Sequence, residues 1–167
     1  MSPLGLEAAV RRTAEEVERM TDASSRNCRT ETQLWYELVA CILGSNIRFE
    51  QARDATRTLK TAGLLSWRQH LCRASLWSVQ IERVLRGRPR RKSVYRFPRL
   101  AATRICSTAE NIYGAGRRIM DVLNSGCTPS EVREQLVNLA CGVGPKQASL
   151  FLRNVGYTQD FAIIDRH

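Results

Sequence analysis

One lysine in this sequence stands where it could act on a nucleic acid. Lys146 directly follows the turn 142–145, Gly-Val-Gly-Pro, and Asp165 follows a short apolar segment further along the chain. A Gly-x-Gly turn before a helix presents backbone N–H groups to an anion, and its glycines let a phosphate approach the main chain closely. The Lys146 amine could attack C1′ of a sugar and form a Schiff base. The Asp165 carboxylate could stabilise positive charge on that sugar and help to move a proton.

Each residue of this group also has a purely structural interpretation. Gly142 and Gly144 could form an ordinary turn between two helices, and Lys146 could bind a phosphate without taking part in a reaction. Asp165 alone is more often a helix N-cap than a catalyst. The combination of turn, lysine and carboxylate is more specific than any one member, and it favours chemistry on a DNA sugar.

Two helices must hold the turn that precedes Lys146. The segment 128–131, Thr-Pro-Ser-Glu, has a Thr suited to an N-cap, a Pro at the first helical position and a Glu three residues after the cap. It predicts a helix over 129–140 that ends at the turn. Because Pro145 can start a second helix in the same way, we expect a helix-hairpin-helix over 129–154.

The remainder of the chain also has a helical pattern. Apolar residues recur at steps of three and four along most of its length, and no segment alternates convincingly with a period of two. The predicted fold is therefore all-α. A polar stretch separates an N-terminal helix and loop, 1–29, from the domain that contains the hairpin, 30–167. The other predicted helices cover 4–20, 32–43, 48–61, two short helices within 64–85, 99–112 and 116–123.

Two of these predicted helices carry specific expectations about burial. The helix over 32–43 is apolar around most of its circumference, which places it at the centre of the fold. The helix over 48–61 should bury a single face. That face is expected to contain Phe49, Ala52, Thr56 and Leu59.

The net positive charge of the chain indicates which class of molecule it could bind. The chain has 167 residues and a formal net charge of +10, from 26 Lys and Arg against 16 Asp and Glu. So basic a domain is a candidate for binding a polyanion such as DNA, because each neutralised phosphate releases counterions. Arginine supplies 23 of the basic residues, and the three lysines are Lys60, Lys92 and Lys146. With lysine so scarce, one lysine beside a Gly-x-Gly turn is unusual.

The most basic stretch of the chain is the segment 86–92, which its Gly and Pro residues predict to be a loop. Arg88, Arg90 and Arg91 are its candidate DNA contacts. Two interpretations stay open: arginines placed in a narrow minor groove, as in AT-hook segments, or loose contacts with phosphates.

Composition also excludes several classes of protein. The longest strongly apolar stretch, 38–43, is far shorter than the ~20 residues that a membrane span needs, and no basic segment followed by an apolar one opens the chain. We therefore expect an intracellular, DNA-associated protein without a membrane partner. Its six cysteines are scattered and form no C-x-x-C motif, so reduced thiols are favoured over a disulfide framework or a zinc site.

Three segments near the end of the chain carry a specific pattern: 139–149, LACGVGPKQAS, 151–157, FLRNVGY, and 162–167, AIIDRH. They resemble the hairpin, lysine and aspartate motifs of the helix-hairpin-helix DNA glycosylases, and within that superfamily they are most similar to the second family of 8-oxoguanine DNA glycosylases/AP lyases. Weaker similarity to this family is found in 37–46, ELVACILGSN, and in 95–98, YRFP. The resemblance extends over roughly residues 30–167.

The resemblance implies a bifunctional enzyme with two helical subdomains, which flips a damaged purine out of double-stranded DNA into a pocket between them. Lys146 would displace the base and hold the sugar as an imine, and β-elimination would then nick the strand at the damaged or abasic nucleotide. Asp165 would stabilise charge and transfer protons. Gly142 and Gly144 would hold a phosphate, and Asn46 would fill the gap left by the flipped base, unless it is a helix N-cap.

The resemblance also bears on cofactors and on the end of the fold. It makes the hairpin carbonyls candidate ligands of a monovalent cation, and it implies no other metal and no iron–sulfur cluster. Members of the family continue past the Asp-Arg-His motif into a helix that closes the domain, and this chain is expected to lack that helix. Two alternatives therefore stay open: a non-enzymatic or truncated hairpin DNA-binding protein, or a glycosylase for another modified base. We expect a monomer.

Overall fold

The computed structural model describes residues 30–45, 47–87 and 95–161, and these residues form helices joined by short turns without any strand. The predicted all-α class is confirmed. The predicted helix over 4–20 lies outside the described residues. The helices are α2 (Glu31–Leu43), α3 (Phe49–Thr61), α4 (Arg68–Arg86), α5 (Pro98–Ala109), a π-type helical segment η1 (Glu110–Gly114), α6 (Ile119–Leu123), α7 (Pro129–Leu139) and α8 (Pro145–Asn154).

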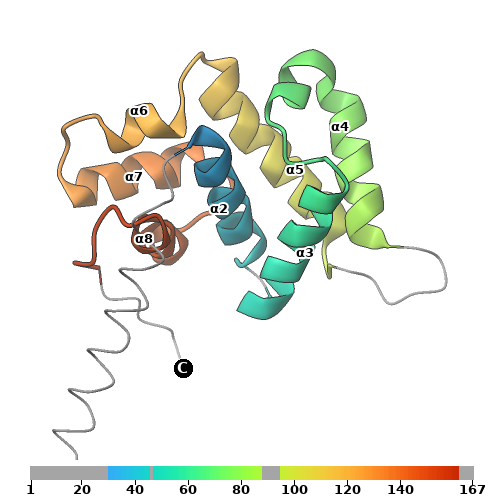
Figure 1. Ribbon diagram of the computed structural model, residues 1–167, viewed down its shortest axis with the longest axis horizontal. Helices are drawn as coiled ribbons and strands as arrows, with labels where there is room; N and C mark the ends of the chain where they lie inside the picture. The colour runs from blue at the N-terminus through green and yellow to red at the C-terminus, as the bar shows by residue number, and fades with distance from the viewer. Residues whose placement is uncertain (1–29, 46, 88–94, 162–167) are drawn as a thin grey trace, which may run out of the picture.

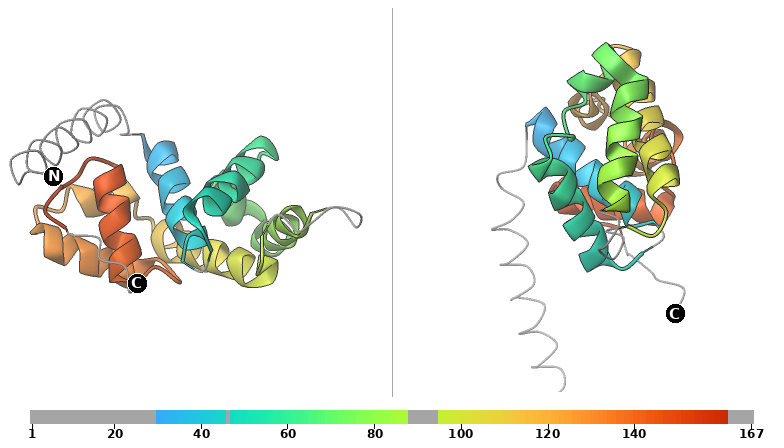
Figure 2. Two further views of the ribbon diagram at one scale, coloured as in Figure 1. Left: turned by 90° about the horizontal axis from the view of Figure 1, so that it is seen from below. Right: turned by 90° about the vertical axis from the view of Figure 1, so that its right-hand side faces the viewer.

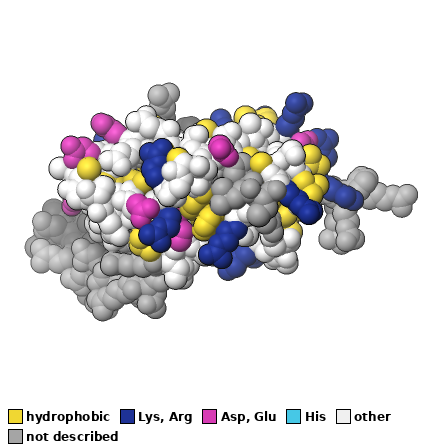
Figure 3. Space-filling model, turned by 90° about the horizontal axis from the view of Figure 1, so that it is seen from above, with side chains coloured by type: hydrophobic (Ala, Val, Ile, Leu, Met, Phe, Trp, Pro, Cys, Tyr) yellow, Lys and Arg dark blue, Asp and Glu magenta, His cyan; other side chains and the backbone are white. Residues whose placement is uncertain are grey.

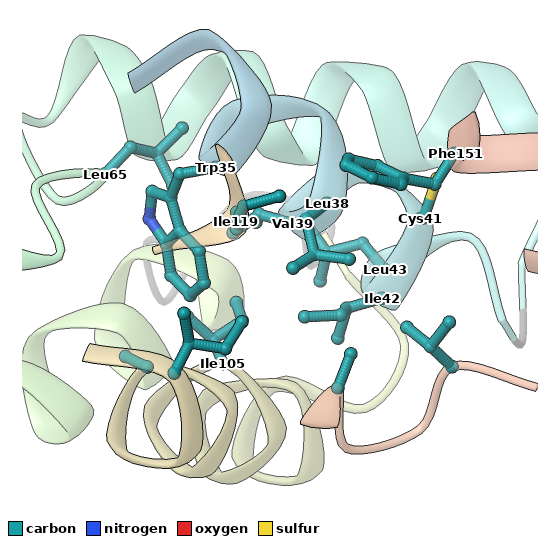
Figure 4. Packing of buried hydrophobic residues seen from close by; sticks show 14 of the residues in the cluster. Trp35, Leu38, Val39, Cys41, Ile42, Leu43, Leu65, Ile105, Ile119 and Phe151 are labelled. Atoms are coloured by element: carbon teal, nitrogen blue, oxygen red, sulfur yellow. The ribbon is translucent and has the colours of Figure 1, made fainter. Parts of the chain in front are cut away.

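Helix α2 lies at the centre of the molecule, as its apolar pattern predicts. It begins at Thr30, whose hydroxyl accepts a hydrogen bond from the Gln33 N–H while the Gln33 side chain accepts one from the Thr30 N–H. Nine of its residues are buried, and Figure 4 shows Trp35, Leu38 and Ile42 among the packed side chains of the core. Its contacts with α3, α5, α6 and α8 make it part of both halves of the fold.

The other helices form two groups on either side of α2 (Figures 1 and 2). Helices α3, α4 and the start of α5 form the first lobe, and α6, α7 and α8 form the second, which contains the hairpin. Helix α5 runs from the first lobe toward the second and continues into η1. The arrangement agrees with the expected two helical subdomains.

The first lobe agrees with the sequence prediction in one detail and departs from it in another. The two short helices expected within 64–85 are present as the two parts of α4, which meet at a kink at Arg73, whose backbone is non-helical (φ −155°, ψ 57°). On α3 the side chains of Ala52, Thr56 and Leu59 are buried as expected, but Phe49 is 54% exposed. Phe49 is the first residue of α3, so it lies at the end of the helix rather than over the core.

The start of α2 is tied to the second lobe by one carboxylate. Glu31 accepts hydrogen bonds from the Tyr113 hydroxyl (2.7 Å) and from the backbone N–H groups of Ile119 (2.8 Å) and Met120 (3.1 Å). Glu31 therefore serves as the anion at the N-terminus of α6. Burial, together with the bond to Glu31, raises the pKa of the Tyr113 hydroxyl. The phenol stays neutral and keeps donating its proton to the carboxylate.

The cysteines of the described residues agree with the prediction of reduced thiols. Among these residues Cys41, Cys106, Cys127 and Cys141 are free cysteines, the first two of them buried. No helix in the described ranges is both long enough and apolar enough to cross a membrane. On the face drawn in Figure 3, basic side chains are spread across the surface with acidic ones between them.

Candidate active site

The predicted hairpin is present, and its two glycines have different conformations. Helix α7 ends at Leu139 and α8 begins after Gly144, the N-cap, whose extended backbone (φ −94°, ψ −179°) is open to any residue. Gly142 has φ +81°, a left-handed conformation that favours glycine. As the N-cap, Gly144 has no side chain with which to cap α8. A helix N-terminus that follows such a turn is the kind of site at which an anion such as a DNA phosphate binds.

Helix α5 and the η1 segment that follows it are both bonded to the hairpin. The Thr108 hydroxyl accepts a hydrogen bond from the Cys141 N–H (2.9 Å), and the Asn111 side chain donates one to the Leu139 carbonyl (3.0 Å). These bonds occupy main-chain groups on both sides of the end of α7. The hairpin is consequently fixed to the central helices and not only to its own two helices.

Arg104 of α5 packs directly against Gly142. A Cβ atom added to Gly142 would lie 2.5 Å from both Cδ and Nε of Arg104, which is too close for real atoms. The same arginine donates a hydrogen bond from Nη1 to the Ser45 hydroxyl (3.0 Å), in the turn that follows α2. Arg104 therefore connects Gly142 of the hairpin with Ser45, which follows α2.

Lys146 lies in the first turn of α8, half-buried, and lines a pocket of about 210 Å³. The pocket is formed by α2 and the turn after it, by the start of α3 and by the start of α8. Its lining includes Glu37, Cys41, Gly44, Phe49, Lys146 and Gln147. The lysine that the sequence singles out is thus beside a cavity between the two lobes.

Packing of α2 against α8 and α3 explains how the pocket forms. Gly44 at the end of α2 and Lys146 at the start of α8 both line the pocket, and Glu37 of α2 is bonded to Asn154 near the end of α8. The chain runs in opposite directions along α2 and α8 (Figure 2). A Cβ at Gly44 would lie 3.2 Å from the Ala40 carbonyl of α2 itself, and at an ordinary contact distance of 3.8 Å from the Ala52 Cβ of α3.

A buried acidic side chain forms one wall of this pocket. The side chain of Glu37 is 12% exposed, and its Oε2 pairs with Nη1 of Arg53 at 3.0 Å. Its Oε1 accepts a hydrogen bond from the Asn154 amide at 2.7 Å. Three elements, α2, α3 and α8, thus meet at one carboxylate. The Arg53 side chain is 40% exposed, so the ion pair is only partly buried, and the hydrogen bond from Asn154 helps to offset the desolvation of the Glu37 carboxylate.

The neighbouring thiol is unsuited to act as a nucleophile. Burial of Cys41, reinforced by the negative charge of Glu37, raises the pKa of its thiol, and the opposing effect of Arg53 is smaller. Cys41 therefore lines the pocket as a neutral, apolar group. Lys146 is the described pocket residue whose chemistry suits covalent attack.

The remaining predicted site residues lie outside the described residues. They are Asn46, Arg88, Arg90, Arg91 and Asp165, and their roles stay predictions. So does the monovalent cation: within the described hairpin the Leu139 carbonyl already accepts from Asn111 and the Ala140 carbonyl from the Val143 N–H, which leaves fewer carbonyls to bind it. No group of three or more His, Cys, Asp or Glu in the described ranges could hold a metal.

Sequence reasoning missed Arg104, Glu37, Arg53 and Asn154. A signal existed for Glu37, because a charged residue interrupts a helix that is otherwise apolar around its circumference. Nothing comparable marks Arg104 among the 23 arginines, since its role depends on a glycine and a serine from two distant segments.

Comparison with known proteins agrees with this geometry. The model of the 8-oxoguanine DNA glycosylase family matches residues 15–167. The 8-oxoguanine DNA glycosylase/AP lyases of Saccharolobus solfataricus and Metallosphaera sedula are 33% and 36% identical to this chain over 156 and 142 residues. These matches cover 92% and 84% of this chain and 66% and 61% of the relatives. The chain therefore spans two thirds or less of the length of these relatives.

Comparison with solved structures also finds 8-oxoguanine DNA glycosylases. The 8-oxoguanine DNA glycosylase of Methanocaldococcus jannaschii superposes with a TM-score of 0.66 at 29% identity, covering 91% of this chain and 64% of that one. The 8-oxoguanine DNA glycosylase of Thermotoga maritima gives 0.70 at 26% identity, covering 97% and 70%. With a family match over nearly the whole chain and relatives that share about a third of its residues, the chain belongs to the 8-oxoguanine DNA glycosylase family.

Proposed function

We propose that this protein is a bifunctional DNA glycosylase/AP lyase that excises 8-oxoguanine from double-stranded DNA through a Schiff base on Lys146. One observation carries the proposal: the lysine that follows the Gly-Val-Gly-Pro hairpin lines a pocket between the two lobes. A hairpin that binds a phosphate brings the adjacent nucleotide to this lysine, and a pocket beside it gives a flipped base a place to enter.

The reaction uses the amine in its uncharged form. Nζ of Lys146 bonds to C1′ of the damaged nucleotide as the C1′–N9 bond breaks, and the purine leaves with the electron pair and takes up a proton. The resulting ammonium nitrogen loses a proton, and its lone pair then forms a C1′=N bond while the C1′–O4′ bond opens and O4′ is protonated. Loss of a proton from C2′ breaks the C3′–O bond and nicks the strand.

We assign the other predicted residues supporting roles in this reaction. Asp165 stabilises positive charge on the sugar as the base departs and carries protons between the amine and the leaving groups. Gly142 and Gly144 hold the phosphate that fixes the register of the DNA. Asn46 occupies the space that the flipped nucleotide leaves in the duplex.

Borohydride trapping tests the role of Lys146. Duplexes that contain 8-oxoguanine or an abasic site are incubated with the protein and borohydride, which reduces the imine to a stable adduct. We expect a covalent adduct with the unmodified protein and none with Lys146→Gln. Lys60→Gln is the matched control, since Lys60 is an exposed lysine on α3 far along the helix from the pocket.

The same experiment separates the proposal from its rivals. If the unmodified protein binds duplex DNA in a salt-sensitive manner but forms no adduct, it is a hairpin DNA-binding protein and not an enzyme. If an adduct persists in Lys146→Gln, another amine is the nucleophile. A panel of lesions identifies the base, because a different modified purine that is excised faster than 8-oxoguanine contradicts the assigned substrate.

Asp165→Asn tests the second predicted catalytic residue. We expect this variant to bind damaged DNA as tightly as the unmodified protein and to release the base much more slowly, because an amide cannot stabilise the developing charge. Binding is measured by fluorescence anisotropy and base release by single-turnover kinetics. Equal loss of binding and base release would mean that Asp165 has a structural role instead.

A further inference from the structure

The pocket beside Lys146 contains one acidic residue among its described lining residues, Glu37. The other polar groups there are the Cys41 thiol, which burial keeps neutral, the Gln147 amide and the basic side chains of Arg48 and Lys146. Glu37 is therefore the strongest hydrogen-bond acceptor available to a molecule in this pocket. Glu37 has no role in the proposed reaction or in the binding of phosphate by the hairpin.

The position of Glu37 relative to Lys146 is set by helix geometry. Glu37 is bonded to Asn154 (2.7 Å), which lies about two helical turns, ~12 Å of helix rise, from Lys146 along α8. On α2, Glu37 likewise precedes Gly44 by about two turns. Glu37 and Lys146 therefore reach the same pocket from opposite ends of its wall.

The two edges of a flipped purine match the two ends of this pocket. Its glycosidic bond must lie at the Lys146 amine, so its Watson–Crick edge, which is the edge farthest from the sugar, points away from the lysine. Enzymes that flip a base commonly read it by hydrogen bonds to this edge. The Glu37 end of the pocket is where that edge comes to lie.

The Glu37 carboxylate is held in a fixed orientation with one acceptor direction to spare. A carboxylate has about four lone-pair sites. In the bonds of the described residues, Oε1 accepts from Asn154 and, at 3.4 Å, from Arg53, while Oε2 accepts from Arg53 alone. Because two partners from different helices fix the group, binding a base there requires little reordering of the side chain.

We infer that Glu37 is the residue that selects guanine-derived lesions, by accepting a hydrogen bond from N1–H of the flipped base. This inference rests on the proposed function. Guanine and 8-oxoguanine both carry a proton on N1, whereas adenine-type bases have an N1 lone pair that would face the carboxylate and be repelled by it. Glu37 therefore rejects adenine-derived lesions and leaves discrimination between guanine and 8-oxoguanine to other groups.

Substrate analogues test the inference without altering the protein. Single-turnover excision is measured on duplexes that contain 8-oxoguanine, 8-oxohypoxanthine or 8-oxoadenine. The hypoxanthine analogue lacks the 2-amino group but keeps N1–H, so we expect its excision within about tenfold of 8-oxoguanine. Excision of 8-oxoadenine is expected to be slower by at least roughly a hundredfold, as for a polar site left unpaired. Comparable excision of 8-oxoadenine would overturn the inference.

Glu37→Gln tests the same point from the protein side. We expect excision of 8-oxoguanine to fall roughly tenfold to a hundredfold, the size of a lost charged hydrogen bond, and the preference over 8-oxoadenine to narrow. Trapping on abasic DNA should fall far less, because no base occupies the pocket. Equal losses in both assays would mean that Glu37 only supports the structure.

A second variant and the wild-type control complete the test. Asn154→Ala removes one partner of Glu37 but keeps the carboxylate, so we expect slower excision with the preference for guanine-derived lesions retained. Loss of that preference in Asn154→Ala with Glu37 intact would contradict the assignment. Failure of the unmodified protein to trap on abasic DNA would instead refute the proposed function, which keeps the two failures distinguishable.

Discussion

Two structural reasons favour a glycine at position 142. The backbone is left-handed, and the side chain of Arg104 occupies the space that a Cβ would fill. The sequence predicts this glycine for its approach to a phosphate. The structure adds a second reason, because Arg104 must pass over it to reach Ser45.

Gly142→Ala should therefore lower the free energy of unfolding by more than the backbone strain alone would explain. We expect a loss of roughly 2–4 kcal/mol in the free energy of unfolding, from the left-handed conformation and from displacing Arg104. Gly116→Ala is the matched control: Gly116 has φ +72° but nothing within 4 Å of an added Cβ, so about 1–2 kcal/mol is expected. Urea unfolding measures both, and equal losses would contradict the packing of Arg104 on the glycine.

Helix ends are the elements that the sequence predicts best. The Thr128 cap, the start of α7 at Pro129 and the start of α8 at Pro145 all agree with the structure, since each depends on residues within one turn of one another. The contacts of Glu37 with Arg53 and Asn154 depend instead on how α2, α3 and α8 pack. Such contacts cannot be found from local spacing, and for that reason the sequence does not predict which residues line the pocket, apart from Lys146.

The capping box of α7 gives this element a pH dependence. Hydrogen bonds from the Thr128 side chain and backbone lower the pKa of the Glu131 carboxyl below its ordinary value. A lowered pKa in the folded state means that the contribution is complete above the unfolded value, ~4.3, and is lost as the pH falls through the lower folded value. The cap at the first helix of the hairpin therefore weakens in acid.

Glu131→Gln tests this dependence. We expect the variant to unfold at a lower urea concentration than the unmodified protein at pH 7, with the difference shrinking as the pH falls from about 5 toward 3. Glu134→Gln, an exposed residue in the same helix, should show no comparable change. A difference between Glu131→Gln and the unmodified protein that stays constant with pH would contradict the role of the charge.

For the whole molecule, the net charge of +10 predicts DNA binding that weakens steeply with salt. The logarithm of the binding constant should fall linearly with the logarithm of the salt concentration, with a slope near −0.9 for each phosphate neutralised. On the face drawn in Figure 3, basic side chains lie among acidic ones, so the charge total alone does not identify which arginines contact DNA.

The salt dependence of binding also tests whether the basic segment 86–92 contacts DNA. Replacing Arg88, Arg90 and Arg91 together by Gln should reduce the slope by about two to three if all three contact phosphates. Replacing Arg57 and Arg86, which pair with Asp54 and Glu82, should change it little. Anisotropy titrations between 50 and 200 mM salt, values chosen because binding changes strongly there, measure both. An unchanged slope in the triple variant would remove the loop from the DNA interface.

The carboxylate of Glu31 at the start of α2 constrains how the chain can fold. It bonds to Tyr113, Ile119 and Met120, residues that follow it by more than eighty positions, while the remainder of the same helix packs on α3. The core of each lobe is therefore complete only when α2 has packed against both lobes. A break in the chain between α5 and α6 would leave two fragments that each lack half of their packing, and the intact protein should unfold in a single cooperative step.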